Sequence, residues 1–251
     1  MSMKVSVIMV AYNSQLTIKR SIESFLSQDY KNKELIVVDG ASSDGTCRIL
    51  EEFNSPLIKV HSEVDEGIYD AMNKGLRLMT GECFGFLNSD DCYARKDVLS
   101  IVTSALNDID IVSGGLCFVR EHGDYPCVRV WHPERYSAGI YGKGFSVPHP
   151  STYCRYSVFD KVGEFSTRYS SAGDYDWFLR SFELEGFSHG VLPEVLVKMR
   201  IGGESTGSLA SILNNSKEML EVRRNRLGVG LIDSALLLNL GKKIRQLFQS
   251  E

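Results

Sequence analysis

Short apolar runs rich in Val and Ile alternate with amphipathic stretches along the first part of the chain. The runs end in polar turns, which predicts buried β-strands, and the stretches repeat apolar residues at a spacing of about 3.6, which predicts helices. We expect strands at residues 4–11, 34–39, 57–61 and 83–88, with a helix after each of the first three. This alternation predicts an α/β fold with a mostly parallel sheet, right-handed crossovers and helices on both faces.

The pattern is less regular in the second half of the chain. Glycine and proline are frequent around residues 139–150, which predicts a mobile loop beside a functional site. Expected helices lie at 97–106, at 155–162, at 174–185 and from 209 onward. Further expected strands lie at 109–113 and 191–199. We predict one domain at residues 1–201, followed by a helical C-terminal extension at 202–251.

Size and composition narrow the class of protein. The 251 residues are 43% hydrophobic, enough to bury the core of one large domain. A formal net charge of −4 argues against a nucleic-acid binder. The six cysteines contain no C-x-x-C pair, so we expect reduced thiols in a cytoplasmic protein. The chain contains no apolar window of the roughly 18 residues that a transmembrane helix requires.

Residues 227–248 form an unusual tail. Leucine and isoleucine dominate this segment, and Lys242, Lys243 and Arg245 interrupt the apolar positions. An apolar stripe with clustered cations is typical of a helix that lies in a membrane interface. The alternative is a tail helix that packs on the domain or on a dimer partner.

Acidic residues follow two of the predicted strands. Asp39 and Asp44 come after the second strand, and the adjacent pair Asp90 and Asp91 comes after the fourth. Ligands of open α/β sheets bind outside the carboxyl ends of strands. Oxygen ligands without a nearby Cys or His set favour Mg²⁺ or Mn²⁺ that bridges to phosphates. Instead of binding a ligand, Asp39 could form a turn and Asp44 could cap a helix. A purely structural role is harder to assign to Asp90 and Asp91, because two adjacent carboxylates repel each other unless a cation compensates their charge.

Four segments in this region resemble the successive motifs of the family 2 inverting glycosyltransferases, which have the GT-A (Rossmann-like) fold. They are residues 5–14, 38–46, 67–75 and 86–91. Their order and spacing both match, and together the motifs are far more specific than any one of them.

The resemblance implies a donor pocket and a divalent cation, Mn²⁺ or Mg²⁺. Tyr12 would lie near the nucleotide base, Asp39 would accept a hydrogen bond from a uracil-like ring, and Asp91 would hold the metal against the diphosphate. The family has an aspartate-any-aspartate pattern where this chain has Asn-Ser-Asp-Asp at residues 88–91. Which of the two carboxylates would bind the metal directly is therefore left open. The full set of implied donor-side residues is Ala11, Tyr12, Asn13, Asp39, Asp65, Asn73 and Asp90.

The acceptor side is expected in the second half. Residues 173–180 resemble an acidic motif of the family, although Gly173 stands where Glu is common. Asp174 is the candidate general base and Asp176 the runner-up, and the alternative for either is a helix cap. Trp177 is predicted to lie in the core.

Three further residues are assigned to the acceptor or phosphate side. His149 lies in a segment that resembles an acceptor-side loop, and Arg200 and Gly203 lie in one that resembles a loop near the diphosphate. The alternative for His149 is a purely structural histidine. For Arg200 it is a surface salt bridge, and for the loop that contains Gly203 it is a flexible connector.

The resulting hypothesis is a metal-dependent inverting glycosyltransferase. It would move a sugar from a nucleotide-sugar, expected to be a UDP-sugar, to a saccharide or lipid-linked saccharide in polysaccharide biosynthesis. We expect a cytoplasmic protein, with the tail as a contact to the inner membrane face or to a homodimer partner. The alternatives are a noncatalytic nucleotide-sugar-binding partner in a synthase complex and a sugar nucleotidyltransferase, although the latter should have a Gly-rich basic loop after the first strand.

Overall fold

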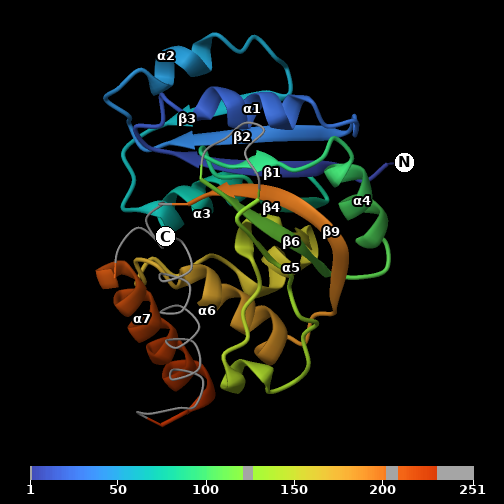
Figure 1. Ribbon diagram of the computed structural model, residues 1–251, viewed down its shortest axis with the longest axis vertical. Helices are drawn as coiled ribbons and strands as arrows, with labels where there is room; N and C mark the ends of the chain where they lie inside the picture. The colour runs from blue at the N-terminus through green and yellow to red at the C-terminus, as the bar shows by residue number, and fades with distance from the viewer. Residues whose placement is uncertain (1, 121–126, 202–208, 231–251) are drawn as a thin grey trace.

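The computed structural model describes residues 2–120, 127–201 and 209–230 (Figure 1). Strands and helices alternate in the first half, as the sequence predicts. They are β1 (Val5–Ala11), α1 (Ile18–Leu26), β2 (Lys33–Asp39), α2 (Thr46–Glu51), β3 (Ile58–Ser62), α3 (Ile68–Leu78) and β4 (Cys83–Phe86). β1 pairs in parallel with β2 and β4, and β2 pairs in parallel with β3. β1 and β2 each contain an apolar run, residues 7–11 and 35–38, because parallel strands are covered on both faces.

The second half completes the sheet with strands of mixed direction. Its first elements are β5 (Cys92–Tyr93), α4 (Val98–Ala105), β6 (Ile111–Val119), β7 (Arg129–Trp131) and the 3₁₀ helices η1 (Ile140–Lys143) and η2 (His149–Ser151). The remaining ones are β8 (Thr152–Arg155), α5 (Tyr156–Val162), α6 (Gly173–Leu179), the π-helical η3 (Arg180–Leu184), β9 (His189–Arg200) and α7 (Leu209–Leu227). Within the described residues the strand order is β3-β2-β1-β4-β8-β6-β9-β5, with β7 on β6.

The direction of β8 makes the sheet mixed. β8 lies between β4 and β6 and runs antiparallel to both, whereas β9 runs parallel to β6. The sequence did not indicate β8 because it is only four residues long and a helix follows at once. The helix expected at 174–185 is divided into α6 and the π-helical η3.

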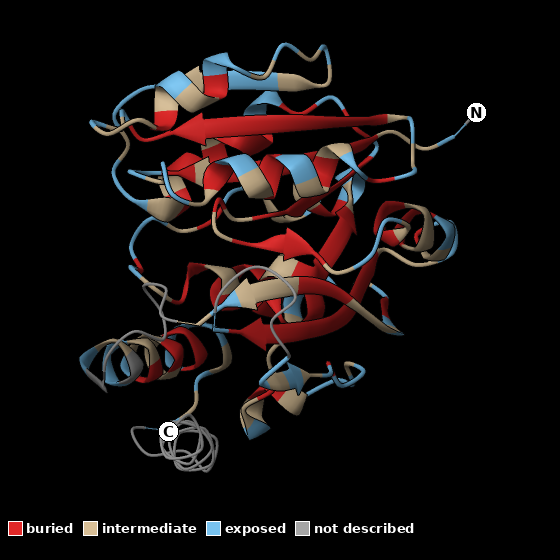
Figure 2. Ribbon diagram, turned by 45° about the horizontal axis from the view of Figure 1, so that its top comes forward, coloured by how far each residue is buried: buried red, intermediate tan, exposed pale blue. Residues whose placement is uncertain are grey.

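Two apolar layers cover the sheet. One face packs against α3, α5, α6 and α7, and the other against α1, α2 and α4. Figure 2 shows the buried strands between these partly exposed helices. The prediction that Trp177 belongs to the core is confirmed, because its side chain is fully buried and its indole Nε1 donates to the Gly163 carbonyl at 2.7 Å.

Helix α7 belongs to the segment predicted as a C-terminal extension. Its Met219 and Val222 join the core cluster that includes α6. Residues 231–251, which make up most of the expected membrane or dimer helix, lie outside the described residues. No helix in the described part of the chain is long and apolar enough to cross a membrane.

The expectation that all six cysteines are reduced is wrong for one pair. The structure joins Cys117 and Cys127 by a disulfide, with Cα atoms 5.8 Å apart. The antiparallel pairing of β6 and β7 brings the two together, and the Val128 N–H donates to the Phe118 carbonyl at 2.8 Å beside them. A spacing of ten residues without a C-x-x-C pattern did not reveal this contact. Cys47, Cys83, Cys92 and Cys154 are free thiols.

His189, a buried histidine at the start of β9, forms hydrogen bonds with β6 and with the segment at Tyr136. The Tyr136 N–H donates to His189 Nδ1 at 3.1 Å, and His189 Nε2 lies 3.0 Å from Ser113 Oγ. Thr152 Oγ1 lies 2.8 Å from Ser113 Oγ and donates to the Pro148 carbonyl at 2.9 Å. Because Nδ1 is an acceptor, the ring is neutral and carries its proton on Nε2. Burial, reinforced by the charge of Arg135, lowers the pKa of His189 from 6.5 to about 4.

This histidine should make stability depend on pH. Between pH 6.5 and about 4, His189 is protonated in the unfolded state but not in the folded state. The free energy of unfolding therefore falls as pH decreases through this window. We expect a loss of about 3 kcal/mol from this group, measurable by urea unfolding at pH 7 and pH 4. His189→Gln serves as the comparison and should lose correspondingly less. An equal loss in both proteins would contradict the assignment.

Candidate functional site

The strands bring several loops to one edge of the sheet. Ala11 ends β1 and is in register with Asp39, which ends β2, and Asp39 is in register with Ser62, which ends β3. β4 is parallel to β1, so the loop that carries Asp90 and Asp91 leaves from the same edge. The residues expected at the carboxyl ends of separate strands therefore share one edge.

The mixed second half contributes to the same edge. β8 is antiparallel to β4, so it begins where β4 ends, and η2 with His149 directly precedes it. β9 runs parallel to β6, which is antiparallel to β8, so β9 ends at this edge with Arg200. Strand direction thus explains how residues far apart in the sequence approach the acidic pair.

Asp39 is a buried carboxylate surrounded by donors. It accepts hydrogen bonds from the Ser42 N–H at 3.0 Å, from Ser62 Oγ at 2.7 Å, from the Ser42 hydroxyl and from the Cys47 thiol. Burial alone would raise its pKa, but the hydrogen bonds from Ser42 and Ser62 outweigh it and hold the pKa of Asp39 below its ordinary value. The group stays an ionised acceptor at neutral pH.

Asp65 and Tyr12 lie beside Asp39. A Cβ atom on Gly40 would stand 2.4 Å from Asp65 Oδ2 and 3.4 Å from the Tyr12 ring, so glycine permits this close approach. Tyr12 is 66% exposed and offers its ring to solvent. Asn13 links the two loops, since its N–H donates to Ser42 Oγ at 2.8 Å. The structure therefore groups four predicted donor-side residues.

Asn73 lies elsewhere. Its side chain is buried, its Nδ2 donates to the Phe165 carbonyl at 2.9 Å, and its Oδ1 accepts from the Phe165 N–H at 2.8 Å. Both ends of the amide hold the backbone of the segment after α5. The structure does not bring this side chain to the group around Asp39.

The acidic pair consists of one buried and one partly exposed carboxylate. Asp91 is fully buried; its Oδ2 accepts from Asn88 Nδ2 at 2.9 Å, and its Oδ1 has no hydrogen-bond partner among the described residues. Burial raises the pKa of Asp91 well above its ordinary value, and the charge of Asp90 adds to this. Arg200 Nε lies 3.8 Å from Asp90 Oδ2.

This pair fits a divalent cation. A buried carboxyl oxygen without a partner, next to a second carboxylate, has the oxygen chemistry that Mg²⁺ and Mn²⁺ prefer. Within the described residues no cluster of three or more His, Cys, Asp or Glu side chains surrounds one point. Such a cation would need further oxygens from a phosphate-bearing ligand, as is usual for Mg²⁺.

Asp174 stands at the start of α6 and is held by a tyrosine. Tyr69 Oη donates to Asp174 Oδ1 at 3.1 Å, and the Tyr175 N–H donates to the same oxygen at 2.8 Å. Burial raises the pKa of Tyr69 well above its ordinary value, and the charge of Asp174 adds to this, so Tyr69 keeps its proton. A Cβ on Gly173 would lie 2.8 Å from the Tyr69 ring, which accounts for glycine where the family often has Glu.

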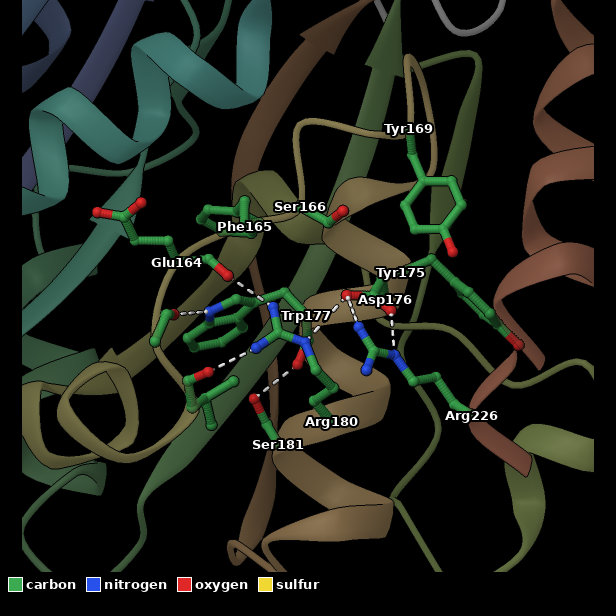
Figure 3. A network of polar contacts seen from close by, with 12 residues as sticks. Glu164, Phe165, Ser166, Tyr169, Tyr175, Asp176, Trp177, Arg180, Ser181 and Arg226 are labelled. Carbon is green, nitrogen blue, oxygen red and sulfur yellow. Dashed lines mark hydrogen bonds and ion pairs between the residues drawn. The ribbon is translucent and has the colours of Figure 1, made fainter. Parts of the chain in front are cut away.

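Asp176 has a different environment. It is fully buried and pairs with Arg180 Nε at 2.9 Å and with Arg226 Nε at 2.8 Å. Figure 3 shows the two guanidinium groups meeting at this carboxylate, and Arg180 also donating to the Glu164 carbonyl. These contacts occupy both oxygens in structural ion pairs.

Two buried polar atoms lie close to Asp174. His149 packs against Phe86, with ring centroids 4.6 Å apart, and its Nε2 has no partner among the described residues. Burial lowers the pKa of His149 although the charge of Asp174 opposes it, so the ring is neutral. Tyr141 Oη is likewise buried without a hydrogen-bond partner in the described ranges. Gly203 lies outside the described residues.

Several residues around these groups escaped the sequence reasoning. Tyr69 lies in residues 67–75, a segment that resembles a family motif, but nothing in this segment indicates a contact with Asp174. Ser62 could have been found from the register of β3 with β2, since strand ends in register lie side by side. Cys47 and Tyr141 carried no signal in the sequence.

The fold and the site define a class of protein. Solved glycosyltransferase structures of the GT-A type superpose on most of the chain. Staphylococcus aureus TarS matches with a TM-score of 0.68 and 21% identity over 98% of this chain, which spans 44% of the TarS chain. The mannosyltransferase PcManGT from Pyrobaculum calidifontis, in complex with GDP-Man and Mn²⁺, matches with a TM-score of 0.70 and 21% identity, covering 94% of this chain and 68% of that one. The protein therefore has the GT-A fold.

Sequence comparison places the chain within this class. The profile described as "Glycosyl transferase family 2" matches residues 6–164, so the chain belongs to glycosyltransferase family 2. An uncharacterized glycosyltransferase of Rickettsia prowazekii is 30% identical over 225 residues, which is 85% of this chain and 68% of that protein. A PGL/p-HBAD biosynthesis glycosyltransferase of Mycobacterium bovis is 27% identical over 187 residues, or 70% of this chain and 69% of that protein. Asp174 and Asp176 lie beyond residues 6–164, the part that the family profile matches.

Asp91→Asn should stabilise the protein when no divalent cation is present. Removal of a buried, half-satisfied carboxyl group should raise Tm in chelator by about 2–4 °C, which is about 1 kcal/mol at this chain length. The gain should grow with pH, because the unfolded carboxyl ionises near pH ~4 while the folded one resists ionisation.

The control for this prediction is Asp90→Asn, which removes a partly exposed carboxylate that pairs with Arg200 and should bring no comparable gain. Excess Mn²⁺ should raise the Tm of the wild type but not that of Asp91→Asn. A lower Tm for Asp91→Asn in chelator would argue against a poised cation site. All values come from thermal unfolding followed by circular dichroism.

Proposed function

We propose that the protein is a metal-dependent inverting glycosyltransferase. It would transfer a sugar from a UDP-sugar to a saccharide or lipid-linked saccharide acceptor in polysaccharide biosynthesis. The observation that carries this proposal is the hydrogen bond between Tyr69 and Asp174. It ties the start of α3, just after the Asp65 loop, to the start of α6, which supports a role for Asp174 next to the proposed donor site.

The solved neighbours support a nucleotide-sugar donor. One is a TarS fragment in complex with UDP-GlcNAc, with a TM-score of 0.69 and 22% identity, covering 93% of this chain. Another, PcManGT, is in complex with GDP-Man and Mn²⁺. Uracil and guanine both carry a ring N–H next to a carbonyl, and the ionised Asp39 is suited to accept from such a group. Tyr12, exposed beside it, offers a ring for stacking on the base.

The diphosphate would lie between the acidic pair and Arg200. Asp91, assisted by Asp90, would hold the divalent cation, which when bound stabilises the negative charge of the leaving diphosphate. Arg200 is half-exposed beside Asp90 and carries a planar fork that suits phosphate oxygens. The sugar would then point from the diphosphate toward the start of α6.

Asp174 would act as the general base. Both hydrogen bonds that it accepts from described residues end on Oδ1, which leaves Oδ2 to take the proton of the acceptor hydroxyl. The hydroxyl oxygen attacks the anomeric carbon from the face opposite the departing diphosphate, so the configuration inverts and no covalent sugar intermediate forms. His149, whose Nε2 has no partner among the described residues, stays the candidate for a contact with the acceptor or a phosphate.

Two parts of the hypothesis rest on the sequence alone. The C-terminal tail as a membrane or dimer contact lies mostly beyond residue 230, and the cytoplasmic location stays a prediction. Membership of a glycosyltransferase family favours sugar transfer over nucleotidyl transfer. The experiment on Asp174 below distinguishes a catalyst from a noncatalytic nucleotide-sugar-binding partner.

Asp174→Asn should abolish transfer and preserve donor binding. Loss of the base should lower kcat about 10²- to 10⁴-fold, whereas the affinity for UDP should change less than about threefold. The measurements are product formation from UDP-sugars with Mn²⁺ and calorimetry with UDP. Asp160→Asn, at an exposed carboxylate of α5, is the matched control and should behave as wild type. Near-normal kcat in Asp174→Asn would remove Asp174 as the base.

The nucleotide base should be selected by Asp39. UDP should compete with the donor and CDP should not, because the cytosine ring nitrogen at the equivalent position is an acceptor and would face an ionised carboxylate. Asp39→Asn should weaken UDP binding about 10- to 100-fold, which corresponds to the usual free-energy contribution of a charge-assisted hydrogen bond. Glu51→Gln, exposed on α2, is the control. Equal competition by CDP, or stronger competition by GDP, would contradict a UDP-sugar donor.

A further inference from the structure

Helix α7 contacts the segment that leads into α6. The Glu218 carboxylate accepts five hydrogen bonds from three consecutive residues: from the Ser170 N–H and Oγ at 3.0 and 2.8 Å, from the Ser171 N–H and Oγ at 2.8 and 3.1 Å, and from the Ala172 N–H at 3.0 Å. Asn215, on the same helix, donates to the Ser171 carbonyl at 2.8 Å. Glu218 thus fixes the backbone immediately before Asp174.

One of these contacts reaches the N-cap residue of α6. Ala172 is the N-cap residue of α6, and its own side chain makes no capping hydrogen bond. The first N–H groups of a helix have no partner within the helix, and a negative charge near them is favourable. Glu218, 46 residues after Ala172, accepts the N–H of this N-cap residue and brings a negative charge to the start of α6. Burial would raise the pKa of Glu218, but the hydrogen bonds from Ser170 and Ser171 outweigh it and lower that pKa, so the charge persists at neutral pH.

A second set of contacts anchors α6 just after Asp174. Arg226 of α7 pairs with Asp176 through Nε at 2.8 Å and Nη2 at 3.3 Å (Figure 3). Arg223 Nη1 donates to Tyr175 Oη at 3.2 Å. Asp174 is therefore flanked by an α7 contact at residue 172 and by others at 175 and 176.

We propose that α7 is the positioning helix for the base, with Glu218 and Arg226 as positioning residues that hold Asp174 against Tyr69 and toward the donor. The proposal rests on the role proposed for Asp174. Both α6 and α7 lie beyond residues 6–164, the part that the family profile matches. A displacement of about 1 Å is enough to cost such a base on the order of 100-fold in rate.

Glu218→Gln in the full chain tests the proposal. The amide keeps the size of the side chain but loses the charge and points N–H groups at backbone donors. We expect kcat to fall on the order of 10- to 100-fold, with the affinity for UDP within about threefold of wild type, because the hydrogen bonds given for Glu218 in the described part of the chain come from residues 170–172 and Asn214. Glu221→Gln is the matched control, since Glu221 lies on the same helix and pairs with the exposed Arg168. Its kcat should stay within about twofold of wild type.

A double mutant separates positioning from a general structural effect. If Glu218 acts through Asp174, then Glu218→Gln should cause little further loss in an Asp174→Asn background. The full 10- to 100-fold loss in that background, or a Glu218→Gln protein with the kcat of Glu221→Gln, would overturn the proposal. Should Glu218→Gln fail to fold by circular dichroism, Arg226→Gln is held to the same criteria. If Asp174→Asn alone retains near-normal kcat, the base assignment fails first and the positioning role falls with it.

Discussion

The contact between Tyr69 and Asp174 joins the two halves of the site. Tyr69 is buried at the start of α3, its ring occupies the space that a side chain on residue 173 would need, and its hydroxyl donates to Asp174. Glycine at position 173 is therefore a consequence of the tyrosine. The contact ties the acidic start of α6 to the start of α3, which follows the loop that carries Asp65.

Three fully buried carboxylates show how environment separates roles. Neutral hydroxyl and backbone donors surround Asp39 and keep it ionised. Two arginines neutralise Asp176, which makes it part of the framework. Asp91 has one oxygen without a hydrogen-bond partner among the described residues and a like charge beside it, an arrangement that costs stability. Chemically identical side chains thus differ in how far the surrounding groups satisfy them.

Strand direction decides what reaches the site from the second half. An antiparallel β8 begins at the edge where β4 ends, so His149 arrives beside Phe86, while β9 returns in the direction of β4 and delivers Arg200 to the acidic pair. An all-parallel continuation would have placed the segment before each strand at the opposite edge. The mixed half of the sheet is the reason that His149 and Arg200 lie at the same edge as the loops after β1, β2 and β4.

The sequence by itself determined the parallel first half, the acidic strand ends and the family, because these depend on local periodicity and on motifs of contiguous residues. It left the choice between Asp174 and Asp176 open, placed Asn73 in the donor pocket, and gave no sign of β8 or of the bond between Cys117 and Cys127. Those matters depend on partners tens of residues away, such as Arg226 for Asp176 and Phe165 for Asn73. Only the tertiary structure decides which polar groups are already paired, because a hydrogen bond requires two atoms within about 3 Å and local patterns carry no such distance.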